Sequence, residues 1–152
     1  MQLSKNYRIK GLKRRSDLCE GAKIIIRRRF RTVIKKVKSY LIDPSVENLH
    51  KLRVSIRRVR YSLENFGVCY STNEFLMIIE YTKFLQDLIG EARDLDVLPE
   101  KINNLENEIK IHLPERLYAA IEDKKSESRL LIKEELYKFL SNKTIKDFFI
   151  SN

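Results

Sequence analysis

Residues 43–66 read DPSVENLHKLRVSIRRVRYSLENF, and this stretch decides the fold. Its apolar residues recur every three or four positions, which is the period of one face of an α-helix. The Asp43-Pro44 step breaks the preceding pattern, so we expect Asp43 to cap the new helix and Pro44 to occupy its first position. Gly67 follows the last apolar residue and can end the helix. The apolar face consists of Leu49, Leu52, Ile56, Val59, Leu63 and Phe66.

The same helical period extends in both directions from this stretch. The other segments predicted to be helical are residues 17–41, 71–88, 99–111 and 114–140, with one closing turn at 144–149. Gly90 is expected to interrupt the helix that precedes it, and the stretch 93–98 either continues or restarts that helix. No segment has the alternation of a strand, and the connections are short. The sequence therefore predicts an all-α fold, an antiparallel up-down bundle of about four main helices.

Charge is distributed unevenly along the chain. The 152 residues carry a net charge of +10, which suits one domain with an unusual excess of cations. Residues 1–70 contain 19 Lys and Arg but 5 Asp and Glu, whereas residues 71–152 contain 12 and 16. We divide the chain into a basic N-terminal tail, residues 1–16, and a single bundle, residues 17–152. This asymmetry indicates a polyanionic partner that contacts mainly the first half.

Several classes of protein are disfavoured. No apolar run approaches the roughly 18 residues that a membrane helix needs, and the first 17 residues lack the apolar core of a secretory signal. Cys19 and Cys69 each lie among apolar helical positions, so we expect two reduced, buried thiols and a cytoplasmic protein. His50 and His112 are far apart and no metal-binding spacing occurs, so we expect neither a metal nor a cofactor.

A row of basic residues carries the functional signal. His50, Arg53, Arg57 and Arg60 are spaced by three, four and three positions, which puts them on one helical stripe about 15 Å long. Like charges along a stripe repel one another, whereas aligned guanidiniums can grip phosphate oxygens in pairs. The alternative is that the arginine stems cover the edge of the core with their charged ends in water. In the preceding helix, the basic residues on the face opposite the apolar one are Arg27, Arg28, Arg31, Lys35 and Lys38.

Two motifs resemble the signatures of a known family. HKLRVSIRRVRY at residues 50–61 and LIGEARDLDVL at residues 88–98 are similar to the two motifs of the CHAD family, the histidine-containing α-helical domains, and the resemblance covers roughly residues 18–140. It implies a helical bundle that binds inorganic polyphosphate along a basic surface without hydrolysing it. The residues expected to contact the polyanion are Arg28, Arg31, Lys35, His50, Arg53, Arg57, Arg58, Arg60 and Arg93.

The chain departs from the family pattern in two ways. Family members usually contain two bundle units, whereas this chain has the length and motifs for one, so a groove that needs both units would require a homodimer. Many relatives are also fused to a catalytic triphosphate-tunnel domain, whose acidic strand motifs are missing here. Together with the lack of a base, nucleophile or metal set, this predicts a protein that is not an enzyme.

Two further hypotheses remain open. The first is sequence-independent binding of RNA or DNA through the phosphate backbone, for which only Tyr61 offers a stacking aromatic near the basic row. The second is an enzyme that acts on phosphate-rich substrates. We expect His50 to be non-catalytic, and we expect Asp94 and Asp96 to hold arginines rather than a metal. We also expect the basic faces of the first two helices to share one concave surface.

Overall fold

The prediction of an all-α fold is confirmed. A computed structural model describes residue 11 and residues 17–70 and 73–151, and this part of the chain contains helices and no strand. The elements are α1 (Leu18–Ile42), α2 (Val46–Asn65), the short 3-10 helix η2 (Gly67–Cys69), α3 (Asn73–Ile109), α4 (Glu115–Ser141) and α5 (Lys143–Ser151). The basic tail that we assigned to residues 1–16 lies outside the described residues, apart from Gly11.

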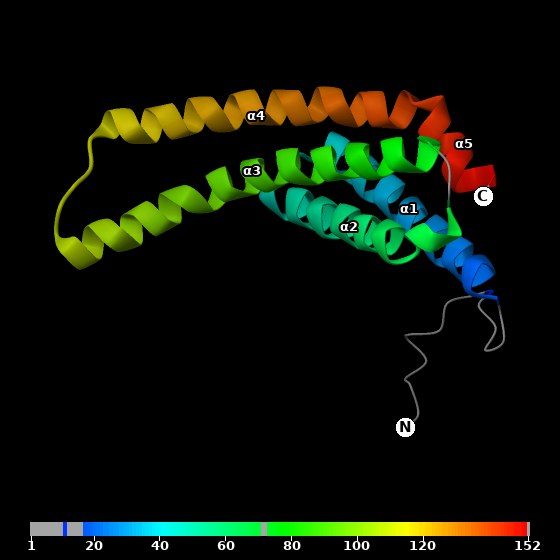
Figure 1. The fold of residues 1–152 in the computed structure, drawn as a ribbon. Helices are drawn as coiled ribbons and strands as arrows, with labels where there is room; N and C mark the ends of the chain where they lie inside the picture. Colours follow the sequence, from blue (N-terminus) through cyan, green and yellow to red (C-terminus); the bar gives the residue numbers. More distant parts are fainter. Residues whose placement is uncertain (1–10, 12–16, 71–72, 152) are drawn as a thin grey trace.

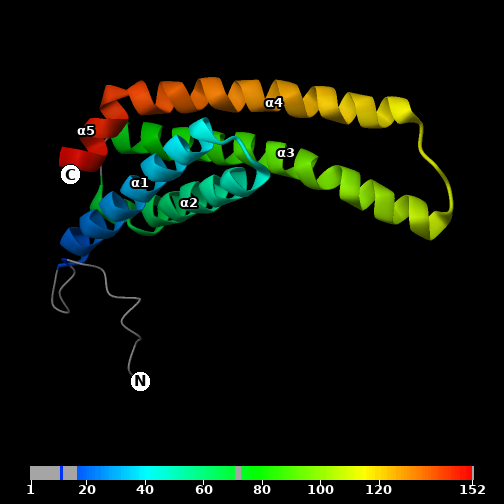
Figure 2. The same cartoon turned by 180° about the vertical axis from the view of Figure 1, so that it is seen from behind.

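The helices form two antiparallel hairpins. α1 and α2 lie side by side and pack against one half of the longer α3–α4 hairpin, whose other half extends beyond them as a two-helix arm (Figures 1 and 2). The core lies where the two hairpins meet, and buried apolar side chains of α1, α2, α3, α4 and α5 form it. The outer faces of α1 and α2 are therefore left open to solvent.

α5 closes one end of the bundle. The sequence predicts a single closing turn here, whereas the structure has a nine-residue helix. Its side chains Ile145, Phe148 and Phe149 are buried, and the ring of Phe149 stacks on Phe30 of α1 with centroids 3.8 Å apart. Burial of these three side chains stabilises a helix that is too short to persist alone.

The start of α2 differs from the prediction by two residues. Ser45, not Asp43, is the N-cap, because its hydroxyl accepts the Asn48 N–H at 3.3 Å. Asp43 instead accepts hydrogen bonds from the Ser45 hydroxyl at 3.1 Å and from the Asn48 side-chain amide at 2.8 Å. Pro44 therefore precedes the helix rather than beginning it. The carboxylate of Asp43 holds the α1–α2 connection in a fixed shape.

α3 is one continuous helix, so the predicted interruption at Gly90 is wrong. Glycine costs a helix about 1 kcal/mol relative to alanine, and the buried neighbours Leu88, Ile89 and Ala92 offset that cost by packing into the core. Pro99 also lies inside α3, where it removes one backbone donor. The outer half of α3 slopes away from α4 (Figure 1).

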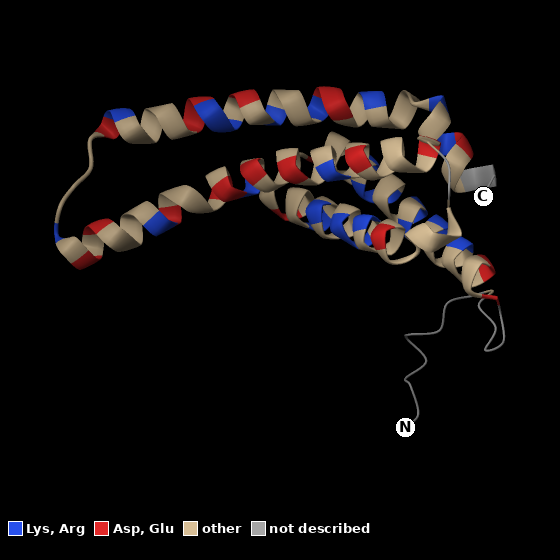
Figure 3. Cartoon of the chain, viewed as in Figure 1, with Lys and Arg blue, Asp and Glu red and all other residues tan. Residues whose placement is uncertain are grey.

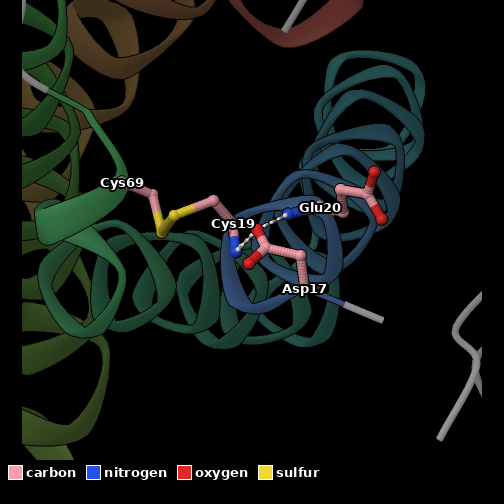
Figure 4. Close-up of a disulfide and its surroundings, with 4 residues drawn as sticks. All are labelled: Asp17, Cys19, Glu20 and Cys69. Carbon is pink, nitrogen blue, oxygen red and sulfur yellow. Dashed lines mark hydrogen bonds between the residues drawn. A yellow bond between two sulfur atoms is a disulfide. The ribbon is translucent and has the colours of Figure 1, made fainter. Parts of the chain in front are cut away.

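The two cysteines are bonded to each other, so the prediction of two reduced thiols is wrong. Cys19 lies in the first turn of α1 and Cys69 ends η2, and their Cα atoms are 5.3 Å apart in a disulfide (Figure 4). Antiparallel packing of α1 and α2 brings the beginning of one helix next to the end of the other, which joins residues 50 positions apart. The expectation of a reducing compartment rested on free thiols and loses that support.

None of the described helices is long and apolar enough to cross a membrane.

Candidate polyanion-binding surface on α1 and α2

The predicted basic row runs along α2 beside its buried face. Leu49, Leu52, Ile56, Val59 and Leu63 are buried on the adjoining face of the helix. His50 and Arg57 are exposed, whereas Arg53 and Arg60 are partly covered. Arg58 is exposed as well, on the flank of α2 that faces α1. Four of these five residues therefore share one stripe, and Arg58 lies beside it.

Arg53 lies against the glycine of the second motif. A Cβ atom added to Gly90 would lie 3.9 Å from the Arg53 Nε, an ordinary van der Waals distance, so the arginine side chain reaches α3 at this residue. The Nε atom is buried and makes no hydrogen bond within the described residues. The two sequence motifs thus meet in space, where Arg53 of α2 lies against Gly90 of α3.

The two ends of the α2 surface are neutralised by carboxylates. Lys51 forms a salt bridge with Glu47 at 2.5 Å, and Arg60 forms one with Glu64 at 2.9 Å. The hydrogen bond to Glu64 raises the pKa of Arg60, and Asp87 of α3 adds to the effect. The free positive charge of α2 is therefore concentrated in its middle, on Arg53, Arg57 and Arg58.

The basic residues of α1 fall into an exposed set and a structural set. Arg28, Arg31, Lys35 and Lys38 are exposed, as predicted for the face opposite the apolar one. Arg27 is half-buried, and its Nε makes no hydrogen bond to a described residue.

Arg29 is a structural residue that the sequence analysis missed. Its guanidinium donates to the Arg58 carbonyl oxygen at 2.9 Å and to the Ser62 hydroxyl, which joins α1 to α2. Burial lowers the pKa of Arg29, and Arg58 lowers it further. The signal in the sequence was its spacing of three from Ile26 and four from Val33, which places it at the edge of the buried stripe.

The cations of α1 and α2 differ from those of α4 in their pairing. Leaving Arg28 aside, no Lys or Arg of α1 forms a salt bridge with a described carboxylate, and neither does Arg53, Arg57 or Arg58 of α2. In α4, by contrast, the paired cations are Lys124, Lys125, Arg129 and Lys138. Figure 3 shows the result, with blue gathered on α1 and α2 and both colours mixed on α4.

An acidic stripe on α3 borders this surface. Glu80, Asp87, Glu91 and Asp94 are exposed and spaced by seven, four and three positions, so they share one outer face of α3 (Figure 3). Asp87 is close enough to influence Arg60 of α2. The positive surface therefore ends where α2 meets α3 and continues in the other direction, across α1.

Arg93 belongs to an ion-pair network and not to the exposed surface. It lies 3.8 Å from Asp96, whose side chain is 3% exposed and which also binds Arg129 of α4 at 2.7 Å. Arg129 in turn donates to the Pro44 carbonyl oxygen at 2.7 Å. The expectation that Asp96 holds arginines is confirmed, whereas Asp94 is exposed on the acidic stripe. Arg129 was missed because its partners lie 85 and 33 residues away in the sequence.

Metal ligands do not gather in the described residues. No group of three or more His, Cys, Asp or Glu side chains in them is placed to hold a metal ion. The basic surface of α1 and α2 itself offers guanidinium, ammonium and imidazole groups, whose hydrogen bonds suit the oxygens of phosphate.

Comparison with known proteins identifies the family. No curated protein and no solved structure matches the chain significantly. The family model of the CHAD domain matches residues 10–103, which is more than half of the chain and includes α1, α2 and both motifs. The chain therefore belongs to the CHAD family.

Proposed function

We propose that the outer surface of α1 and α2 binds inorganic polyphosphate without catalysis. The observation that carries the proposal is a set of exposed cations with no carboxylate partner among the described residues, namely Arg31 and Lys35 on α1 and Arg57 and Arg58 on α2. Such cations repel one another, and a polyanion that lies along both helices removes the repulsion and accepts their hydrogen bonds. Membership of the CHAD family supports the same ligand class.

A second candidate is a nucleic acid bound through its phosphates. Tyr61 is 48% exposed, and the Arg60 guanidinium lies 5.8 Å from the centre of its ring. An exposed aromatic beside cations can stack on a base. The surface offers one aromatic ring for stacking but several cations that have no carboxylate partner among the described residues. We therefore favour polyphosphate, whose binding depends on charge alone.

The proposal is tested by neutralising equal charge on different helices. We expect Arg31→Ala/Lys35→Ala and Arg57→Ala/Arg58→Ala each to weaken polyphosphate binding at least about tenfold, because each pair removes charge-assisted contacts. The matched control is Lys124→Ala/Lys138→Ala, which removes the same charge from paired cations of α4. A calorimetric titration measures all three. Equal losses in all three variants would mean that net charge, and not this surface, determines binding.

The proposal includes the absence of turnover. We expect no orthophosphate to be released when polyphosphate or a nucleoside triphosphate is incubated with the protein. Release that disappears in His50→Ala, while binding is retained, would make this a catalytic site.

A further inference from the structure

The basic row of α2 has a neighbour on α3 with the same spacing and the opposite charge. Each row has four residues, separated by three, four and three positions. The α2 row is His50, Arg53, Arg57 and Arg60, and the α3 row is Phe84, Asp87, Glu91 and Asp94. The two helices are antiparallel and packed side by side, so that blue on α2 borders red on α3 (Figures 1 and 3). The molecule therefore presents a positive row and a negative row next to each other.

The packing of α2 against α3 fixes which residues of the two rows are level along the helices. Arg53 lies against Gly90, one position before Glu91. Because the helices are antiparallel, four residues further along α2 correspond to four residues back along α3. Arg57 is therefore level with Asp87 to within about one residue, or about 1.5 Å of helix. By the same count the α2 row, taken from 50 to 60, matches the α3 row taken from 94 to 84.

The two rows do not neutralise each other within one chain. Asp87, Glu91 and Asp94 are exposed and form no salt bridge with a described cation, and Arg57 is exposed and forms none with a described carboxylate. Each row also has an exposed aromatic ring at the same end of the pair. Tyr61, which follows the α2 row, is 48% exposed, and Phe84 of the α3 row is 46% exposed. Both rows are therefore available to a partner with complementary charge.

We propose that this partner is a second copy of the chain, with the α2 row of each copy on the α3 row of the other. A two-fold axis parallel to the helices produces this arrangement, because it exchanges the two rows and keeps every residue at its level. Arg57 then faces the partner's Asp87, and Tyr61 faces the partner's Phe84. A two-fold axis lying across the helices would instead place α2 on α2, where like charges repel. Charge therefore selects the parallel axis.

The dimer is weak and depends on salt. Each copy carries a net charge of +10, which repels a second copy over long distances. At physiological ionic strength the Debye length is about 8 Å, so this repulsion is largely screened, whereas charges in direct contact are screened much less. The rows are only about 15 Å long, and small interfaces of this kind are transient. We therefore expect a dissociation constant on the order of 0.1–1 mM.

Charge reversal on one row at a time tests the pairing. The rotational correlation time of isotope-labelled protein, measured by NMR at physiological salt without polyanion, should rise toward twice the monomer value as wild type approaches about 1 mM. Arg57→Glu and Asp87→Arg each place like charges opposite one another, so each variant alone should stay monomeric. The matched control is Lys133→Glu, which makes the same charge change as Arg57→Glu on an exposed lysine beside Tyr40, between α1 and α4. It should dimerise at least as well as wild type.

A mixture of the two variants is the decisive measurement. Labelled Arg57→Glu and unlabelled Asp87→Arg should form a mixed dimer, because opposite charges then face each other at both pairs, and a variant that had lost its fold could not be rescued in this way. Wild type that stays monomeric up to about 1 mM, single variants that dimerise like wild type, or a mixture that stays monomeric would overturn the proposal. A dimer that is lost in Asp87→Arg but retained in Arg57→Glu would mean that other cations occupy the α3 row, which overturns the pairing as well.

The dimer covers the α2 row, so polyphosphate and the second copy should compete for it. This consequence, unlike the dimer, rests on the proposed function. When polyphosphate chains outnumber the protein, the correlation time of labelled wild type should fall to that of one copy with one chain. Polyphosphate that binds and leaves the dimer intact would overturn the pairing through the α2 row. Polyphosphate that does not bind would refute the proposed function and leave the dimer, which is measured without it, in place.

Discussion

The side chain of Arg129 connects three separate parts of the fold. It joins α4 to Asp96 of α3 and to the Pro44 carbonyl of the α1–α2 connection. The sequence could predict that Asp96 holds an arginine, because Arg93 lies three positions before it on the same helix. It could not predict Arg129, since nothing local to residue 129 reveals a contact with residues 44 and 96.

Loss of Arg129 should therefore destabilise the whole bundle. We expect Arg129→Ala to lower the free energy of unfolding by about 3 kcal/mol, because the buried Asp96 carboxylate loses its shorter ion pair. Chemical denaturation measures the change. Lys124→Ala, which breaks an exposed pair on the same helix, serves as control and should stay close to wild type. Equal stability of the two variants would mean that the buried pair contributes little.

The burial of Tyr81 predicts that the free energy of unfolding falls at alkaline pH. Burial raises its pKa to about 12, and Glu135, to which its hydroxyl points, raises it too. The folded state therefore favours the neutral phenol, and this contribution is complete below pH 10 and is lost as the pH rises toward 12. We expect the free energy of unfolding to fall more steeply between these pH values in wild type than in Tyr81→Phe. Parallel curves would refute the assignment.

At the scale of helices, local patterns predicted the elements and missed their connections. Apolar periodicity located the helices. Asp17 is the N-cap of α1, because its carboxylate accepts hydrogen bonds from the Cys19 and Glu20 N–H groups, as aspartate commonly does at this position. Gly90 was expected to interrupt one helix and residue 99 to begin another, because propensity disfavours glycine and proline inside a helix. Tertiary packing overrides that preference in α3, where Leu88, Ile89 and Ala92 are buried. The sequence alone does not contain those contacts.

The disulfide between Cys19 and Cys69 joins α1 to the segment after α2, and its effect on the free energy of unfolding can be measured. Cross-linking positions 50 residues apart restricts the unfolded chain, which corresponds to about 2–4 kcal/mol of stability. We expect Cys19→Ser, or reduction of the wild type, to lower the free energy of unfolding by that amount. Reductant should have no effect on Cys19→Ser, which is the internal control. A wild type that is equally stable with and without reductant would contradict the bond.

At the scale of the whole molecule, charge is divided between the two hairpins. α1 and α2 carry cations that have no carboxylate partner among the described residues, whereas α3 carries an exposed acidic stripe and α4 pairs four of its six cations with carboxylates (Figure 3). The sequence predicted this division from the charge difference between its halves. It predicted the α2 stripe as well, because helical spacing alone fixes which residues share a face. It did not predict that Arg60 is neutralised by Glu64.

The central claim is that this surface binds a polyanion by charge and prefers polyphosphate. The most direct measurement is a competition titration at two salt concentrations, with polyphosphate and single-stranded RNA of equal total charge, on wild type and Arg53→Ala/Arg57→Ala. We expect polyphosphate to bind more tightly than RNA, affinity to fall as salt rises, and the double variant to lose two or more decades. Equal affinity for RNA, or a double variant that binds polyphosphate like wild type, would contradict the account.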